Sequence, residues 1–163
     1  MIEQATSSFW SRLALAVLPV LAAGALGSIA TTPNIPTWYA GLEKPGFTPP
    51  NRIFAPVWTL LYLMMAYAAW RILSVPPGSP GRSEALAAFF VQLALNAAWS
   101  WAFFAFHSPL GGLCVIVPLL LAIGITIAWF WPLDRAAALL LLPYLAWVGY
   151  ATALNFAVWK LNA

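Results

Sequence analysis

The stretch ALAAFFVQLALNAAWSWAFFAFHSPLGGLCVIVPLLLAIGITIAWFWPL, residues 85–133, has no charged side chain in 49 positions. As one continuous α-helix it would be about 74 Å long, more than twice the thickness of the hydrocarbon core of a bilayer. The segment His107-Ser-Pro-Leu-Gly-Gly112 combines Pro with two Gly, residues that interrupt helices. The stretch therefore predicts two membrane-spanning helices, at about residues 85–106 and 110–131.

Charged residues divide the rest of the chain in the same way. The other long uncharged stretches cover residues 13–42, 53–70 and 136–159. Since a spanning helix needs about 20 mostly apolar residues, they predict spans at about 13–31, 53–73 and 137–159. We therefore expect an all-α fold: an integral membrane five-transmembrane-helix bundle that forms a single domain over residues 1–163.

The composition of the chain supports a membrane environment. Of its 163 residues 63% are hydrophobic and 7% are charged, whereas a typical soluble domain has about 25% charged residues. These values exclude an ordinary soluble enzyme, a disordered chain and a nucleic-acid binder with a basic face. The partner that they predict is the lipid bilayer. We read the net charge of +3 as headgroup and orientation charge, although four basic residues against three on the two sides do not decide the orientation.

Conventional catalytic and metal-binding groups are scarce. One Cys (Cys114), one His (His107) and four acidic residues leave no disulfide within the chain and too few ligands for a metal site. We therefore predict no catalytic and no metal-binding residues.

The longest loop, at about residues 32–52, has a composition that suggests a defined shape. It reads Trp38-Tyr-Ala-Gly-Leu-Glu-Lys-Pro-Gly-Phe-Thr-Pro-Pro50, with three Pro and two Gly. Because five spans are an odd number, this loop, the loop near His107 and the C-terminus share one side of the membrane. The loop is either an interfacial segment with aromatic anchors or a lid over a cavity between the helices.

Polar side chains inside the spans each need a partner. Gln92, Asn96 and Ser100 are spaced four residues apart and share one helix face. For Gln92, as for Asn155 in the last span, we favour a hydrogen bond between helices. Trp99 lies one helical turn after Asn96, and an amide beside an aromatic ring is suited to contact a ligand. For Asn96 we therefore leave open both a ligand contact and a hydrogen bond between helices.

The ten tryptophans fall into two groups. Most lie near span ends, where aromatic belts explain them. Trp58, Trp99 and Trp147 lie deeper, and such rings would suit a large flat apolar ligand, such as a tetrapyrrole, a sterol or a carotenoid. Small-residue series occur in two spans, at Ala94, Ala98 and Ala102 and at Gly149, Ala153 and Ala157. They fit either an internal seam or a homodimer interface, and we favour a homodimer through the third span.

Four motifs occur in a fixed order. The loop sequence above is followed by Ala55-Pro-Val-Trp-Thr-Leu-Leu-Tyr62, by Gln92-Leu-Ala-Leu-Asn-Ala-Ala-Trp99 with Phe103-Phe104, and by Pro143-Tyr-Leu-Ala-Trp147 with Leu154-Asn155 and Trp159. Over almost the whole chain the sequence resembles the translocator protein family, also called tryptophan-rich sensory proteins or peripheral-type benzodiazepine receptors. The resemblance implies a five-helix membrane bundle.

The resemblance also implies a function. It indicates a receptor or transport protein in a bacterial membrane that binds porphyrins, such as protoporphyrin IX or a haem-like molecule, as ligand rather than as required cofactor. Regulation of tetrapyrrole or carotenoid metabolism is the implied role. The positions that match the family's ligand pocket are Trp58, Asn96, Trp147, Ala151 and Leu154. Tyr62 and Trp99 lie on the same helix faces, and Trp38 lies in the loop that matches the family's lid. We therefore expect all eight residues to bind the ligand.

Some positions depart from the family pattern. In the motif associated with sterol binding, Phe156 occupies the place of a Tyr, so the sequence does not predict sterol binding. Phe47 replaces a Trp in the loop, and Gly111 and Val115 replace larger residues that animal members have early in the fourth helix. Binding of synthetic drugs is therefore not predicted either.

Two further functions stay open at this stage. One is a light-dependent porphyrin-degrading enzyme that works through tryptophan radicals, because no acid–base or nucleophilic constellation is present. The other is a structural partner subunit in the membrane. We favour binding over both.

Overall fold

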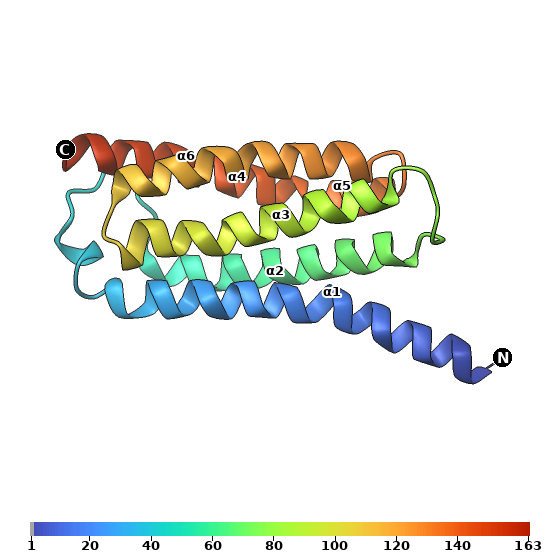
Figure 1. The fold of residues 1–163 in the computed structure, drawn as a ribbon. Coiled ribbons are helices and arrows are strands. Elements are labelled where there is room, and N and C mark those ends of the chain that lie inside the picture. The colour runs from blue at the N-terminus through green and yellow to red at the C-terminus, as the bar shows by residue number, and fades with distance from the viewer. Residues whose placement is uncertain (1) are drawn as a thin grey trace.

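The structure, a computed structural model, describes residues 2–163, with side chains from Ser8 onward. Its elements are α1 (Ile2–Thr31), η1 (Thr32–Asn34), η2 (Tyr39–Gly41), α2 (Asn51–Ser74), α3 (Arg82–Ser100), η3 (Trp101–Ala105), α4 (Pro109–Phe130), α5 (Arg135–Leu140) and α6 (Leu142–Leu161). Within the described residues, five helical segments are long and apolar enough to cross a membrane: Ser8–Asn34, Asn51–Ser74, Arg82–Ala105, Pro109–Phe130 and Arg135–Leu161. The predicted all-α bundle with five membrane-spanning helices is confirmed (Figure 1).

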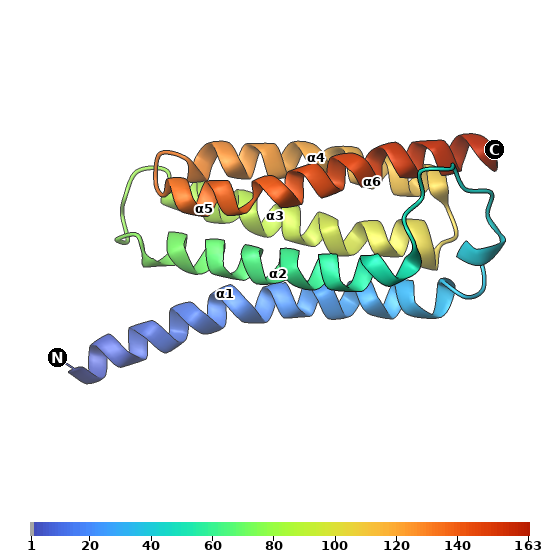
Figure 2. The ribbon, with the colours of Figure 1, turned by 180° about the vertical axis from the view of Figure 1, so that it is seen from behind.

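The helices form an elongated bundle. α1 packs against α2 and α3, α3 against α4, and α4 against α6, while α2 is joined to the last span mainly through α5. The loop between α1 and α2, the connection between α3 and α4, and the C-terminus lie together at one end (Figures 1 and 2). This arrangement follows from the odd number of spans, as predicted.

Specific side chains fix the helix ends at the two short connections. Ser108 precedes Pro109 at the start of α4, and its Oγ accepts a hydrogen bond of 2.9 Å from the N–H of Gly111. Asp134 caps α5 in the same way, accepting from the N–H of Ala137 at 3.0 Å. These caps satisfy backbone donors that a first helical turn leaves without an internal partner.

The first and last spans differ in detail from the predicted ranges. α1 begins at Ile2, well before residue 13, and its first turns extend beyond the bundle (Figure 1). The last span consists of α5 and α6 rather than one helix at 137–159, and Leu141 donates its N–H to the carbonyl of Ala138, three residues earlier. Pro143 explains the break, because proline has no N–H to donate to a carbonyl four residues earlier.

The main apolar core fills one half of the bundle. Its residues come from α1 around Ala16–Ala23, α2 from Leu61 onward, α3 up to Leu93, α4 from Ile116 onward, and α5 with early α6. All these segments lie toward the end that carries the α2–α3 and α4–α5 connections. A smaller cluster of Tyr39, Phe103, Phe104, Leu154 and Val158 lies at the opposite end. The two clusters leave a space between the helices near the loop that follows α1.

Candidate functional site

A cavity of about 410 Å³ lies between the helices at this end of the bundle. Its volume falls within the range of about 300–1,000 Å³ that is typical of small-molecule sites. α1, α2, α3 with η3, and α6 all contribute to its walls. The residues that line it are Val20, Leu21, Gly24, Ala25, Gly27, Ser28, Thr31, Thr32, Ile35, Tyr39, Asn51, Phe54, Ala55, Trp58, Thr59, Tyr62, Asn96, Trp99, Ser100, Phe103, Phe104, Ala151, Leu154, Asn155 and Val158.

The structure brings most of the predicted ligand-binding residues together around this cavity. Those that line it are Trp58, Tyr62, Asn96, Trp99, Ala151 and Leu154. Trp38 lies in the loop outside the lining, where its ring stacks on His107 with centroids 4.9 Å apart. Trp147 also lies outside the lining and packs edge to face against Phe54, at 6.0 Å. A direct ligand contact by Trp38 or Trp147 stays a prediction.

A hydrogen-bonded chain of three side chains crosses the inner end of the cavity. Tyr62 donates its O–H to Oδ1 of Asn96 at 2.8 Å, and Nδ2 of Asn96 donates to the hydroxyl of Tyr144 at 3.0 Å. The ring of Trp58 lies 5.5 Å from that of Tyr62 and 6.3 Å from that of Tyr144. Asn96 thus links α2, α3 and α6 and also faces the cavity, so both roles considered for it are compatible.

Asn155 holds a second polar network. Trp99 donates its indole N–H to Oδ1 of Asn155 at 3.1 Å, and Nδ2 of Asn155 donates to the carbonyl of Pro109 at 2.7 Å. The predicted helix–helix bond of Asn155 is confirmed. The indole N–H of Trp99 already has an acceptor in the protein, so Trp99 offers a ligand its ring surface.

The prediction of a helix–helix hydrogen bond for Gln92 is wrong. Its side chain is fully buried, and neither amide atom has a hydrogen-bond partner among the described residues. Gln92 lies at the middle of α3, between the core residues Phe89 and Leu93. The spacing of Gln92 and Asn96 placed them on one face but did not show which partners would lie opposite.

Phe103 and Phe104 also line the cavity, although the sequence interpretation did not assign them to the site. They lie in η3, a π-helical segment in which Phe106 donates its N–H to the carbonyl of Trp101, five residues earlier. Both rings are buried, and their centroids lie 4.8 Å apart. Such π-helical turns are frequent at functional sites, and no regular helical period predicts that two adjacent residues face the same cavity.

α1 was missed as a cavity wall. A Cβ atom on Gly24 would lie 3.2 Å from Cε2 of Tyr62, and a Cβ on Gly27 would lie 3.2 Å from Oγ of Ser100. The two glycines therefore let α1 approach α2 and α3 closely. The series Gly24-Ala-Leu-Gly27 was the signal that could have placed α1 in the site, since small residues mark close helix packing.

The loop after α1 closes the outer end of the cavity with Thr32, Ile35 and Tyr39. Several contacts hold it in place. Asn162 accepts from the N–H of Glu43 at 3.0 Å and donates to the Glu43 carbonyl at 2.9 Å. Tyr150 donates to the carbonyl of Phe47 at 2.6 Å.

A further contact joins the loop to the α3–α4 connection. Nε2 of His107 lies 2.8 Å from Oδ1 of Asn34. The amide nitrogen of Asn34 donates to the carbonyl of Ala30, so the imidazole must supply the proton in the bond to Asn34.

The electrostatics of the site are those of a neutral cavity. Among the residues that the structure describes, no charged side chain lines it. Lys44 donates to the carbonyls of Ala40 and Leu42, and its amine lies 4.7 Å from the ring centre of Tyr39. Burial raises the pKa of the Tyr39 hydroxyl, and the proximity of Tyr150 adds to this effect, so Tyr39 is uncharged at neutral pH.

Comparison with known proteins gives a consistent result. Residues 15–160 match the sequence profile of the TspO/MBR family. The chain is 46% identical over 155 residues to the Tryptophan-rich protein TspO of Archaeoglobus fulgidus, an alignment that covers 93% of this chain and 97% of that protein. It is 37% identical over 141 residues to the Tryptophan-rich sensory protein of Cereibacter sphaeroides, covering 85% and 87%. The human Translocator protein is 39% identical over 130 residues, covering 77% and 75%.

Proposed function

This chain belongs to the TspO/MBR family, and on that premise we propose that it is a membrane receptor or transport protein for porphyrins and related flat apolar ligands. The ligand occupies the cavity beneath the loop after α1. In this role the protein regulates tetrapyrrole or carotenoid metabolism in a bacterial membrane.

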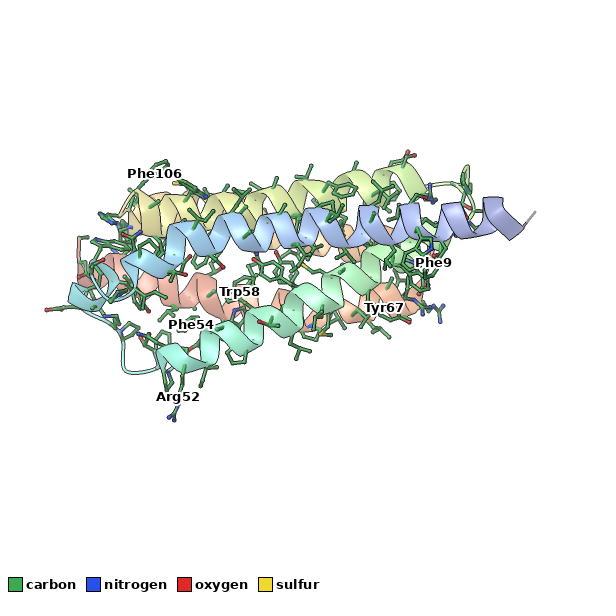
Figure 3. The ribbon with its side chains drawn as sticks, turned by 90° about the horizontal axis from the view of Figure 1, so that it is seen from below. Phe9, Arg52, Phe54, Trp58, Tyr67 and Phe106 are labelled. Carbon is green, nitrogen blue, oxygen red and sulfur yellow. The ribbon has the colours of Figure 1, made fainter. Side chains whose placement is uncertain are left out.

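The observation that carries this proposal is the aromatic lining of the cavity. Phe54 and Trp58 enter it from α2 (Figure 3), and Trp99, Phe103 and Phe104 enter from α3 and η3. Flat rings gain both buried apolar area and favourable stacking against such side chains. Ala151 and Leu154 of α6 complete the lining with smaller apolar groups.

The loop after α1 acts as the lid of this site. Its contacts with Asn162, Tyr150 and His107 hold it over the cavity, and all of them are hydrogen bonds at the surface of the bundle. Such bonds are individually weak, about 1 kcal/mol each. A ligand can therefore enter or leave when a few of them break, while the helices stay packed.

We also propose that the protein is a homodimer through α3. Val91, Ala94 and Ala98 are exposed on this helix, and Ala94 and Ala98 are four residues apart, a spacing that lets two helices approach closely. Chemical crosslinking through a cysteine introduced by Val91→Cys, in a background in which Cys114 is replaced by Ser, tests this interface. A dimer band is expected, and its absence would argue for another interface.

Titration of the purified protein in lipid nanodiscs with protoporphyrin IX tests the binding function. Quenching of tryptophan fluorescence should saturate at one porphyrin per chain. Empty nanodiscs with a soluble tryptophan analogue supply the baseline for partition into lipid. If the quenching rises linearly with porphyrin and never saturates, the protein has no such site and the proposed function is wrong.

A further inference from the structure

The hydroxyl groups on the cavity wall differ from those elsewhere in the chain. Ser28, Thr31, Thr32 and Ser100 all line the cavity, and none of their hydroxyls has a hydrogen-bond partner in the described structure. Every other serine and threonine from Ser8 onward has one. Thr59, Thr126 and Thr152 show the usual arrangement, in which the hydroxyl donates to the carbonyl four residues earlier at 2.7 or 2.8 Å.

This difference has a physical meaning in a membrane-spanning helix. A hydroxyl in an apolar environment is costly unless it is hydrogen-bonded, and the carbonyl four residues earlier is the nearest acceptor. The hydroxyls of Ser28, Thr31 and Ser100 do not use it. They keep both a donor and an acceptor available to whatever occupies the cavity.

The free hydroxyls also lie on one side of the cavity. Ser28 and Thr31 are three residues apart on one face of α1, and Thr32 follows at the start of η1. Oγ of Ser100 faces the same helix, since a Cβ on Gly27 would lie 3.2 Å from it. The aromatic rings of Phe54 and Trp58 come from the neighbouring helix, α2. The cavity therefore pairs a polar edge at α1 with aromatic walls.

The absence of charged side chains among the described lining residues limits which ligand groups can bind at this polar edge. In the part of the chain with described side chains, no lysine, arginine, aspartate or glutamate lines the cavity. A carboxylate bound there would therefore be buried without a counter-charge, which is unfavourable. Neutral oxygen atoms meet no such penalty. Serine and threonine hydroxyls donate to a carbonyl or ester oxygen and also accept from a ligand hydroxyl.

From these observations we infer that the cavity selects flat polycyclic ligands with uncharged oxygen groups (carbonyl, ester or hydroxyl) along one edge, and that Ser28, Thr31 and Ser100 bind that edge. This inference rests on the proposed function and adds the chemistry of the ligand. Because the lining offers no counter-charge, a carboxylate on the same molecule would stay outside the cavity.

Two matched pairs of probes test the inference with the full chain in nanodiscs. Protoporphyrin IX dimethyl ester carries ester carbonyls, whereas etioporphyrin carries only alkyl groups; anthraquinone and anthracene form a second, non-porphyrin pair. We expect the oxygenated member of each pair to bind more tightly. Ser28→Ala and Ser100→Ala should each weaken its binding about fivefold, the equivalent of one hydrogen bond, and leave the hydrocarbon member unchanged.

Thr126→Val is the matched control, because the hydroxyl of Thr126 is bonded to the carbonyl of Ala122 and Thr126 lies on α4, outside the cavity lining. This control variant should leave the affinity for both members of each probe pair unchanged. The inference would be overturned if the oxygenated and the hydrocarbon probe of each pair bound with equal affinity. It would also be overturned if Ser28→Ala and Ser100→Ala weakened the binding of both probes equally. Either result would show that the hydroxyls bind only water. If neither porphyrin binds but anthraquinone binds more tightly than anthracene, the porphyrin function fails while this inference holds.

Discussion

The hydroxyl of Tyr62 on α2 donates a 2.8 Å hydrogen bond to Oδ1 of Asn96 on α3, at the inner end of the cavity. The same asparagine donates to Tyr144 on α6. One side chain therefore fixes the relative positions of three helices that line or support the site, and the shape of the site depends on it.

Removing the Tyr62 hydroxyl should loosen this junction. Tyr62→Phe keeps the ring against Trp58 but leaves Oδ1 of Asn96 without its donor. We expect a loss of about 0.6–1 kcal/mol in the free energy of unfolding, measured by thermal or denaturant unfolding in detergent. Tyr67→Phe, at an exposed tyrosine of the same helix, is the control and should change stability less. Equal effects of the two variants would show that the bond to Asn96 does not stabilise the bundle.

Gly112 should not tolerate a side chain. A Cβ atom there would lie 2.6 Å from Oδ1 of Asn155 and 2.8 Å from Cδ2 of Phe103. Gly112→Ala therefore disturbs both the Trp99–Asn155 bond and a cavity-lining ring, and should cost about 1–3 kcal/mol of stability, typical of overpacking. Gly124→Ala lies on the same helix, and apart from the adjoining residues of its own helix no described atom lies within 4 Å of the new Cβ, so it should be neutral or stabilising. A melting temperature that falls equally in both variants would contradict the predicted clash.

Asp134 should make stability depend on pH at the acidic end. Burial alone would raise the pKa of its carboxyl, but the hydrogen bond from Arg71 and those from the backbone N–H groups of Ala137 and Ala136 hold the pKa below its usual value. Its stabilising contribution is therefore present above the unfolded pKa of about 4 and is lost as the pH falls through the lower folded value.

The ion pair with Arg71, at 2.9 Å and partly exposed, is worth about 0.5–1 kcal/mol. Asp134→Asn keeps a good helix cap but removes the charge. Between pH 6 and pH 3 the melting temperature of this variant should fall less than that of the wild type. Glu84→Gln removes an exposed carboxylate, and over the same pH range its melting temperature should fall as much as that of the wild type. Parallel curves for all three proteins would argue against the pair.

Asn162 should control how often the lid opens. It forms two hydrogen bonds with the backbone of Glu43, so Asn162→Ala leaves that N–H without its acceptor. Hydrogen–deuterium exchange should become faster in peptides that contain Glu43, by about fivefold or more per lost bond, and unchanged in peptides from α4. Unaltered exchange around Glu43 would mean that other contacts hold the loop.

The positions of the spans were predictable because charges are excluded from the hydrocarbon core, so the gaps between charges mark the helices. The break before α6 was not predicted, although Pro143 was visible, because a proline near a helix start is compatible with either one helix or two. The cavity residues of α2, α3 and α6 were predicted largely from the family motifs. The contribution of α1 was not predicted. Gly24 and Gly27 have no side chain and so allow Tyr62 and Ser100 to approach α1 closely, and the sequence does not show which side chains pack against a glycine.

The partners of buried polar groups were the least predictable feature. Asn155 forms hydrogen bonds with Trp99 and Pro109, 56 and 46 residues away, whereas the Gln92 side chain has no hydrogen-bond partner from Ser8 onward. Both are amides inside a span, and their outcomes depend on how the helices rotate against one another, which a periodic pattern on one helix does not fix.

The central claim is that the aromatic cavity under the loop is the ligand site, and the protoporphyrin IX affinity of Trp58→Ala tests it most directly. Trp131→Ala is the matched control, since Trp131 is exposed and lies outside the cavity. We predict that Trp58→Ala weakens binding about tenfold or more, the equivalent of about 1.5 kcal/mol of lost ring contact, and that Trp131→Ala binds like the wild type, with both variants folded by circular dichroism. Wild-type affinity in folded Trp58→Ala would contradict the account.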